Sequence, residues 1–162
     1  MRWVSSDGIM HDVTRHVGEC GPRRRRSMSA EENKTLSNQV AQAVSAGDLD
    51  ALDELMSPEL AEEFKRDVAV IRRAFPDYAG INVDQIAEGE MVANRFVFLG
   101  THLDEFEGVA PTGKRVEFIG HSINRVVEGK IVESWVEVDM LGVMQQLGVV
   151  PEPGQSEEAS PT

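Results

Sequence analysis

Residues 115–138, RVEFIGHSINRVVEGKIVESWVEV, decide the fold class of this chain. The pair Glu128-Gly129 is typical of a tight hairpin turn, and residues of strand-forming type run to either side of it. The stretch therefore predicts two long antiparallel strands, over residues 115–127 and 130–138. A further long strand is expected over residues 91–103, and a first one around Ile81, Val83 and Ile86.

Helical patterns flank these strands. Ser29 and Glu32 form a capping box, in which a hydroxyl and a carboxylate satisfy free N–H groups at a helix start. Gly47 is suited to end that helix, and Asp48 is expected to cap a short second helix. Ser57-Pro58 predicts the start of a third helix. Its expected buried stripe is Leu60, Phe64, Val68, Ile71 and Phe75.

The order of elements predicts an α+β fold. Three N-terminal helices pack on a curved, mostly antiparallel sheet, and a short C-terminal helix follows, capped by Asp139. A curved sheet that wraps a long helix leaves an open end, which is a natural pocket. We expect a pocket domain over residues 29–150, a flexible basic arm over 1–28 and a disordered tail over 151–162. Met28 opens a plausible protein start, so the arm is also open to being a misassigned extension.

The charge of the chain limits its partners. The net charge is −12, and residues 1–27 alone carry a positive balance. A body this acidic gains no counterion release from nucleic acid or from anionic membranes, so neither is expected as a partner. The arginine run 23–26 is either a tether for such surfaces or simply a solvated extension.

Cysteine content and hydropathy indicate a cytoplasmic protein. Cys20 is the single cysteine, and no apolar run approaches the length of a membrane span. His11, His16 and Cys20 match no zinc-ligand spacing, so no metal is expected.

Several stretches resemble the SnoaL-like polyketide cyclases, a family of the nuclear transport factor 2-like superfamily. They are AVSAGDLDALDEL at 43–55, AFPD at 74–77, GTHLDEF at 100–106, APTGKRVEF at 110–118, and residues 125–133 and 139–148. The resemblance implies a cone-like fold with an apolar pocket, no metal, no cofactor and an oligomeric state. The implied chemistry is an intramolecular aldol closure, for which a carboxylate in an apolar pocket is a suitable proton carrier.

One position departs from the family pattern. The resemblance implies an aspartate directly after Trp135, and this chain has Val136 there. Valine cannot transfer a proton. Side chains alternate faces along a strand, so Glu133 and Glu137 are expected on the side opposite to Val136. Asp139 is expected to serve as the cap of the last helix.

The same alternation selects candidate pocket residues. Phe96 and Phe98 share one parity with His102, and Ser134 shares the parity of Val136. Ser122 is expected on the pocket side of its own strand. His102 is the remaining candidate for a general base near neutral pH, at the pocket mouth; the alternative is a rim histidine bonded to a loop carbonyl. The predicted substrate-binding set is Phe96, Phe98, His102, Ser122, Ser134 and Val136.

His121 and Trp135 are expected on the outer face of the sheet. A large exposed aromatic side chain indicates a covered surface, so this face is the predicted contact of a homo-oligomer.

Two functions stay open on these grounds. One is a cofactor-independent cyclase or isomerase with a relocated acid/base residue and a small apolar or polyketide-like substrate. The other is a non-catalytic ligand-binding or oligomerisation module of the same fold.

Overall fold

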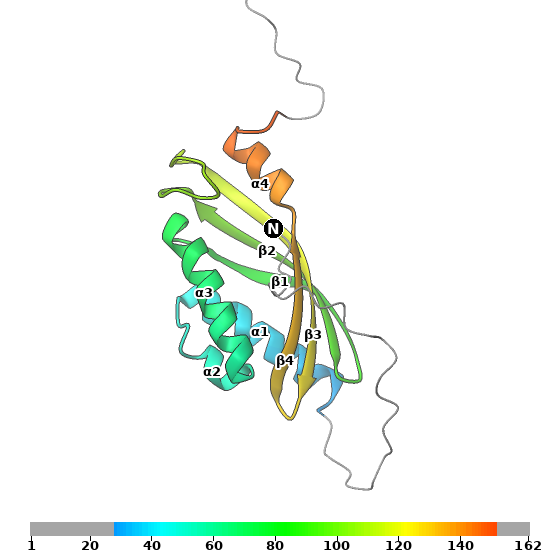
Figure 1. Ribbon diagram of the computed structural model, residues 1–162. Coiled ribbons are helices and arrows are strands. Elements are labelled where there is room, and N and C mark those ends of the chain that lie inside the picture. Colours follow the sequence, from blue (N-terminus) through cyan, green and yellow to red (C-terminus); the bar gives the residue numbers. More distant parts are fainter. Residues whose placement is uncertain (1–27, 152–162) are drawn as a thin grey trace, which may run out of the picture.

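The computed structural model describes residues 28–151, which form two layers. Helices α1 (Ala30–Ala46), α2 (Leu52–Leu55) and α3 (Pro58–Ala74) precede four strands, β1 (Ala79–Glu88), β2 (Met91–Thr101), β3 (Arg115–Val127) and β4 (Lys130–Val138). Helix α4 (Met140–Leu147) follows the last strand (Figure 1). The predicted α+β class and element order are confirmed. The arginine run, His11, His16 and Cys20 lie outside the described residues.

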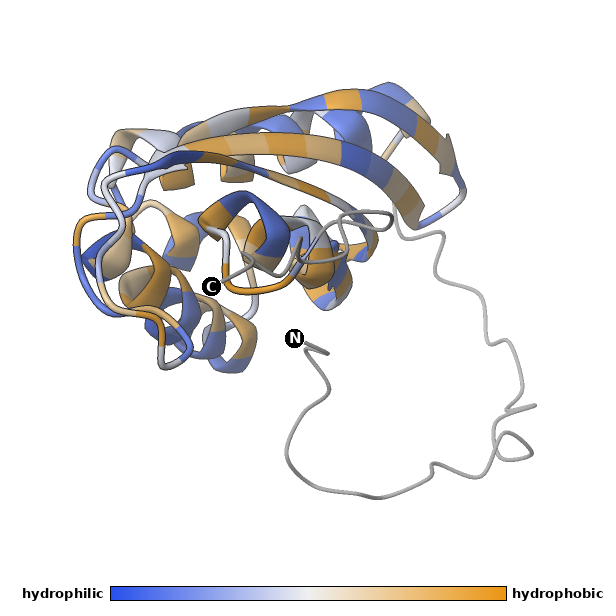
Figure 2. Cartoon of the chain, turned by 90° about the horizontal axis from the view of Figure 1, so that it is seen from above, coloured by the Kyte–Doolittle hydropathy of each residue, from blue (hydrophilic) through white to orange (hydrophobic). Residues whose placement is uncertain are grey.

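The four strands form one antiparallel sheet in the order β1-β2-β3-β4. The sheet is curved and makes one layer, and helices α1 to α3 lie beneath its concave face (Figure 2). Glu128 and Gly129 join β3 to β4 with φ angles of 52° and 82°. Two positive φ values in a two-residue loop match the right-handed twist of the flanking strands. The predicted bounds of β3 and β4 are confirmed.

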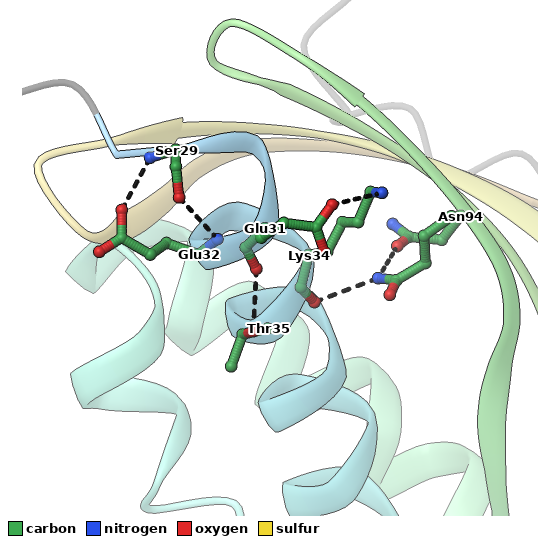
Figure 3. Close-up of polar contacts among 7 residues, drawn as sticks. Ser29, Glu31, Glu32, Lys34, Thr35 and Asn94 are labelled. Atoms are coloured by element: carbon green, nitrogen blue, oxygen red, sulfur yellow. Dashed lines mark hydrogen bonds and ion pairs between the residues drawn. The ribbon is translucent and has the colours of Figure 1, made fainter.

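The capping box begins α1 as predicted (Figure 3). The Ser29 hydroxyl accepts from the Glu32 N–H at 3.2 Å, and the Ser29 N–H donates to the Glu32 carboxylate at 2.7 Å. Gly47 ends the helix in the left-handed conformation. The role of Asp48 differs from the predicted helix cap. Its carboxylate accepts from the Ala51 N–H, but α2 begins only at Leu52, so Asp48 closes the turn before the helix.

Helix α3 begins at Pro58, after Ser57, and ends before Pro76, as predicted. The segment after it is fastened to β2 by Asp77. Its carboxylate accepts from the Thr101 N–H at 2.6 Å and from the Thr101 hydroxyl at 2.7 Å. These hydrogen bonds stabilise the ionised form and hold the pKa of Asp77 below its ordinary value.

Aromatic rings fill the core at the C-terminal end of α3. Phe75 packs edge-on against Phe118 and Phe106 with ring centroids about 5 Å apart, and Tyr78 stacks on Phe98 at 4.8 Å. A second apolar cluster, around Leu52, Met56 and Ile131, lies where α1 and α2 meet the sheet. None of the helices in residues 28–151 has an apolar stretch that could cross a bilayer.

Candidate functional site

A cavity of about 580 Å³ lies between the helical layer and the concave face of the sheet. Its walls come from α1, α3 and the inward side chains of β2, β3 and β4. Most of this lining is apolar, and Phe64, Val68 and Ile71 of α3 contribute to it. A cavity of this size accommodates a drug-sized organic molecule.

Five of the six predicted substrate-binding residues line this cavity. They are Phe96, Phe98, Ser122, Ser134 and Val136. Strand register explains why they meet. Ser122 pairs with Val136, and Asn124 pairs with Ser134, so these side chains share the concave face.

Val136 points to the cavity, as its parity predicts, and it is half-buried there. Its acidic neighbours are engaged elsewhere. Glu133 forms a two-pronged ion pair with Arg125, with distances of 2.7 and 3.0 Å, and this pair lowers the pKa of Glu133. Glu137 is exposed, and Asp139 accepts from the Gly142 N–H at the start of α4. The predicted cap is confirmed. Of these three acids, Glu133 alone lines the cavity, and Arg125 holds its carboxylate.

His102 does not lie at the cavity mouth, and this expectation is corrected. Its side chain is 0% exposed and is stacked on Phe75 with ring centroids 5.1 Å apart. The Nδ1 atom accepts from the Thr112 N–H at 3.2 Å. The backbone of His102 continues the pairing beyond Thr101, since its N–H donates to the Lys114 carbonyl and its carbonyl accepts from the Gly113 N–H, both at 2.9 Å. The strand parity of Phe96 and Phe98 therefore extends to His102 and turns its side chain inward, but it packs against Phe75 in the core and does not line the cavity.

Neutral polar side chains form two short relays on the concave face. In the first, Gln85 donates to the Asn94 carbonyl at 2.8 Å, and the Asn94 amide donates to the Ser122 hydroxyl oxygen at 3.0 Å. Gln85 is held in turn by the Lys34 carbonyl, at 3.2 Å (Figure 3). With its oxygen already accepting, Ser122 keeps its own O–H free to donate to a ligand.

The second relay connects β4 to α1. Ser134 donates to the Asn124 carbonyl at 2.8 Å, and the Asn124 amide donates to Ser37 at 3.2 Å. Ser134 thus keeps a lone pair as an acceptor on the cavity side. Asn94, Asn124 and Ser37 were not predicted from the sequence. Their signal was polar residues at inward strand and helix positions, where apolar ones are usual.

Helix α3 brings carboxylates to the cavity, and these too were missed. Glu59, Glu63 and Asp67 line it at four-residue spacing, next to the predicted apolar stripe. Burial raises the pKa of Asp67 to about 6; the nearby Glu63 adds to this shift and Arg66 opposes it. The sequence signal was Asp67, three residues after Phe64 and directly before Val68, on a face that packs inward.

The family model for the SnoaL-like polyketide cyclases matches residues 34–147. The chain belongs to this family. AclR, a putative hydroxylase from Streptomyces galilaeus, is 30% identical with a TM-score of 0.70, over 76% of this chain and 100% of AclR. IdmH, a putative polyketide cyclase from Streptomyces antibioticus, is 30% identical with a TM-score of 0.65, over 74% of this chain and 99% of IdmH. No match was found among curated proteins.

The cavity of this SnoaL-like chain has a distinctive charge. Its lining includes the carboxylates of Glu59, Glu63, Asp67 and Glu133. Among the described residues 28–151, no lysine, arginine or histidine lines it. Burial also raises the pKa of the Tyr78 hydroxyl, which keeps that lining residue uncharged. Anionic ligands are therefore repelled, and uncharged or cationic ones are admitted.

Proposed function

We propose that this SnoaL-like protein is an enzyme for a small, uncharged, mainly apolar molecule of polyketide type. The proposed reaction is acid/base chemistry such as an intramolecular aldol ring closure. The observation that supports this most is one cavity that combines apolar walls, free neutral hydrogen-bond groups and a half-buried carboxyl. The likeness to IdmH, a putative polyketide cyclase, supports the same substrate class.

The residues on the concave face suit the needs of this reaction. An aldol closure generates an enolate oxygen, which a positioned O–H group stabilises. Ser122 has such an O–H, and Asn94 orients it. Ser134 provides an acceptor for a ligand hydroxyl. Proton transfers and one carbon–carbon bond complete the reaction, so it requires no redox cofactor.

The alternative is a non-catalytic module that binds a ligand or a second copy. The observation that favours it is Val136, since the family position for the proton carrier has no ionisable group. The two functions make different predictions about turnover, and a binding assay alone does not separate them. A cytoplasmic location stays a prediction of the sequence.

Binding and turnover can be measured one after the other. Nile red, an uncharged apolar dye, reports on binding, and heptane-2,6-dione, an uncharged diketone that closes by an aldol reaction, reports on turnover. We expect Val136→Phe to reduce both by filling the cavity, and Val83→Phe, at an exposed position of β1, to reduce neither. Dye binding without any acceleration of ring closure would favour the non-catalytic module.

We also propose that a second copy of this chain covers the convex face of the sheet. Register places Ile86, Ala93, Ile123 and Trp135 in one row across the four strands. Ile86 is 76% exposed and Trp135 is 51% exposed, which is unusual for large apolar side chains arranged side by side. The adjacent row contains His121, flanked by Arg95 and Glu137.

A further inference from the structure

We infer that Asp67, on helix α3, is the catalytic acid/base of the cavity. It would act from the helical wall, in place of an acid on the sheet at position 136. This inference rests on the proposed function, and it adds the residue that carries the proton.

The first argument is the placement of Asp67 on α3. Leu60, Phe64, Val68 and Ile71 form the inward stripe of this helix, and all four line the cavity. Asp67 follows Leu60 by two helical turns, so it lies on the same side. An aspartate on such a face contacts whatever occupies the cavity.

The second argument is that the Asp67 carboxylate is unengaged. Asp53 is paired with Lys65, Asp77 is bonded to Thr101, and Asp139 caps α4. Within residues 28–151, Asp67 is half-buried, and no hydrogen bond or ion pair of its side chain is found. A partly desolvated carboxyl that lines a cavity and has no partner within the described residues is available to a ligand.

The third argument is the balance of charges around Asp67. On its own helix, Glu63 disfavours ionisation, Arg66 favours it, and Glu59 adds a more distant negative charge to the cavity. From the sheet side, Glu133 faces the cavity with its charge offset by Arg125. Burial raises the pKa of Asp67 most, and together with these charges it brings the pKa to about 6, so that Asp67 can alternate between base and acid near that pH.

The proposed steps balance without any further reactant. The Asp67 carboxylate takes a proton from the carbon beside a carbonyl, and the C–H electron pair forms an enolate. The Ser122 hydroxyl donates to the enolate oxygen. The enolate carbon then attacks a second carbonyl of the same molecule, whose π electrons become an alkoxide. That alkoxide takes the proton back from Asp67, so the product is an isomer of the substrate.

Proton removal from carbon can be tested with 5-nitrobenzisoxazole, a small uncharged probe. A carboxylate removes its ring C–H proton, the N–O bond breaks, and a coloured cyanophenolate forms. We expect a rate above the buffer reaction that rises with pH around a midpoint near 6. Asp67→Asn is expected to reduce the rate by about 100-fold, whereas Asp67→Glu keeps part of it. Asp50→Asn, the same substitution on an exposed turn outside the cavity, leaves it unchanged.

A second variant gives a readout that does not depend on the folding of Asp67→Asn. Burial is the largest cause of the raised pKa of Asp67, and the charge of Glu63 adds to it. Glu63→Gln removes that added contribution, so the midpoint of the rate profile is expected at lower pH. An unchanged midpoint would overturn the inference.

Nile red binding separates the inference from the proposed function. If every variant binds the dye and Asp67→Asn keeps the wild-type rate, Asp67 is not the acid/base, while the proposed pocket stands. If the wild-type protein binds neither dye nor probe, the proposed function fails, and this inference fails with it.

Discussion

At the scale of single residues, the hydrogen-bond donor and the proposed proton carrier lie on different walls of the cavity. Val136 leaves the sheet wall apolar, next to the hydroxyl of Ser122, its partner across the strands. The ionisable group comes from the opposite wall, where Asp67 stands on α3. A carboxyl surrounded by apolar side chains has a raised pKa on either wall, so the fold tolerates such an exchange of position.

Asp67 also makes stability depend on pH. Its pKa is raised in the folded chain, so it binds its proton more tightly there than in the unfolded chain. This contribution to stability is complete below the ordinary aspartate pKa and is lost as pH rises to about 6. We expect Asp67→Asn to raise the melting temperature at pH 7.5 and to leave it unchanged at about pH 3.5. A lower melting temperature at pH 7.5 would contradict this.

His102 is expected to contribute to stability and not to ligand chemistry. Its ring is buried against Phe75, and its Nδ1 atom receives the Thr112 N–H. His102→Ala removes a buried ring and leaves that N–H unpaired, which costs about 2–4 kcal/mol of unfolding free energy. Chemical denaturation measures this loss. Nile red affinity, measured where the variant remains folded, is expected to stay at the wild-type level.

Residue-level prediction from the sequence succeeded where the backbone is regular. Strand alternation placed Ser122, Ser134 and Val136 on one face, because β3 and β4 pair without interruption over those positions. The same logic turned His102 inward correctly but was wrong about the cavity mouth, since tertiary packing against Phe75 places this ring in the core. It missed Asp67 because a helical aspartate beside an apolar stripe is usually solvated, and only the cavity makes its position unusual.

At the scale of elements, β3 is built around the cavity. Gly120 lies between Phe118 and Ser122 on the concave face, where the Phe96 ring passes over it. A side chain there would overlap with that ring and with the Glu137 carbonyl. The glycine therefore lets an aromatic wall of the cavity lie flat on the sheet.

Gly120→Ala tests this packing. The added methyl group must displace either the Phe96 ring or the backbone of β4. We expect a loss of about 1–3 kcal/mol in unfolding free energy, together with weaker Nile red binding. Gly89→Ala is the comparison variant, since no other atom lies near the added methyl group. Gly89 stands in a turn with positive φ, so the variant is expected to lose stability without a change in dye affinity.

Local signals predicted most of the elements. The capping box at Ser29, the Glu128-Gly129 turn and the Asp139 cap each rest on residues close in sequence, and each is present in the structure. Asp48 shows the limit of such signals. Its carboxylate accepts from the Ala51 N–H in a turn that, by its sequence, could equally have been the first turn of the helix. Only packing decides that α2 starts later.

At the scale of the whole molecule, each face of the sheet carries side chains of the type that is usual on the other face. The concave face contains the polar relays of Asn94 and Asn124, whereas Ile86, Ile123 and Trp135 lie exposed on the convex face. The first strand was expected from its apolar residues, and these turn out to be the exposed ones. Sequence patterning identifies the strand and does not reveal which face a partner covers.

The proposed contact between two copies predicts a monomeric variant. Trp135→Arg places a charge at the β4 end of the convex apolar row, where desolvation would oppose association. Light scattering after size-exclusion chromatography is expected to give a dimer for the wild-type protein and a monomer for this variant. Leu141→Arg, at an exposed position of α4, is the matched control and is expected to stay dimeric. A monomeric wild-type protein would refute the proposed contact.

The strand order β1-β2-β3-β4 follows the order of the chain, and this has a consequence for how the protein folds. Each strand meets a neighbour in sequence, so closing each loop sacrifices little chain entropy. The sheet can grow hairpin by hairpin, and the two-residue connection at Glu128-Gly129 makes β3 and β4 the natural place for growth to begin. The contact of α1 with β1 closes a longer loop, since α2 and α3 lie between them in the chain, so its entropic cost is larger than that of each hairpin.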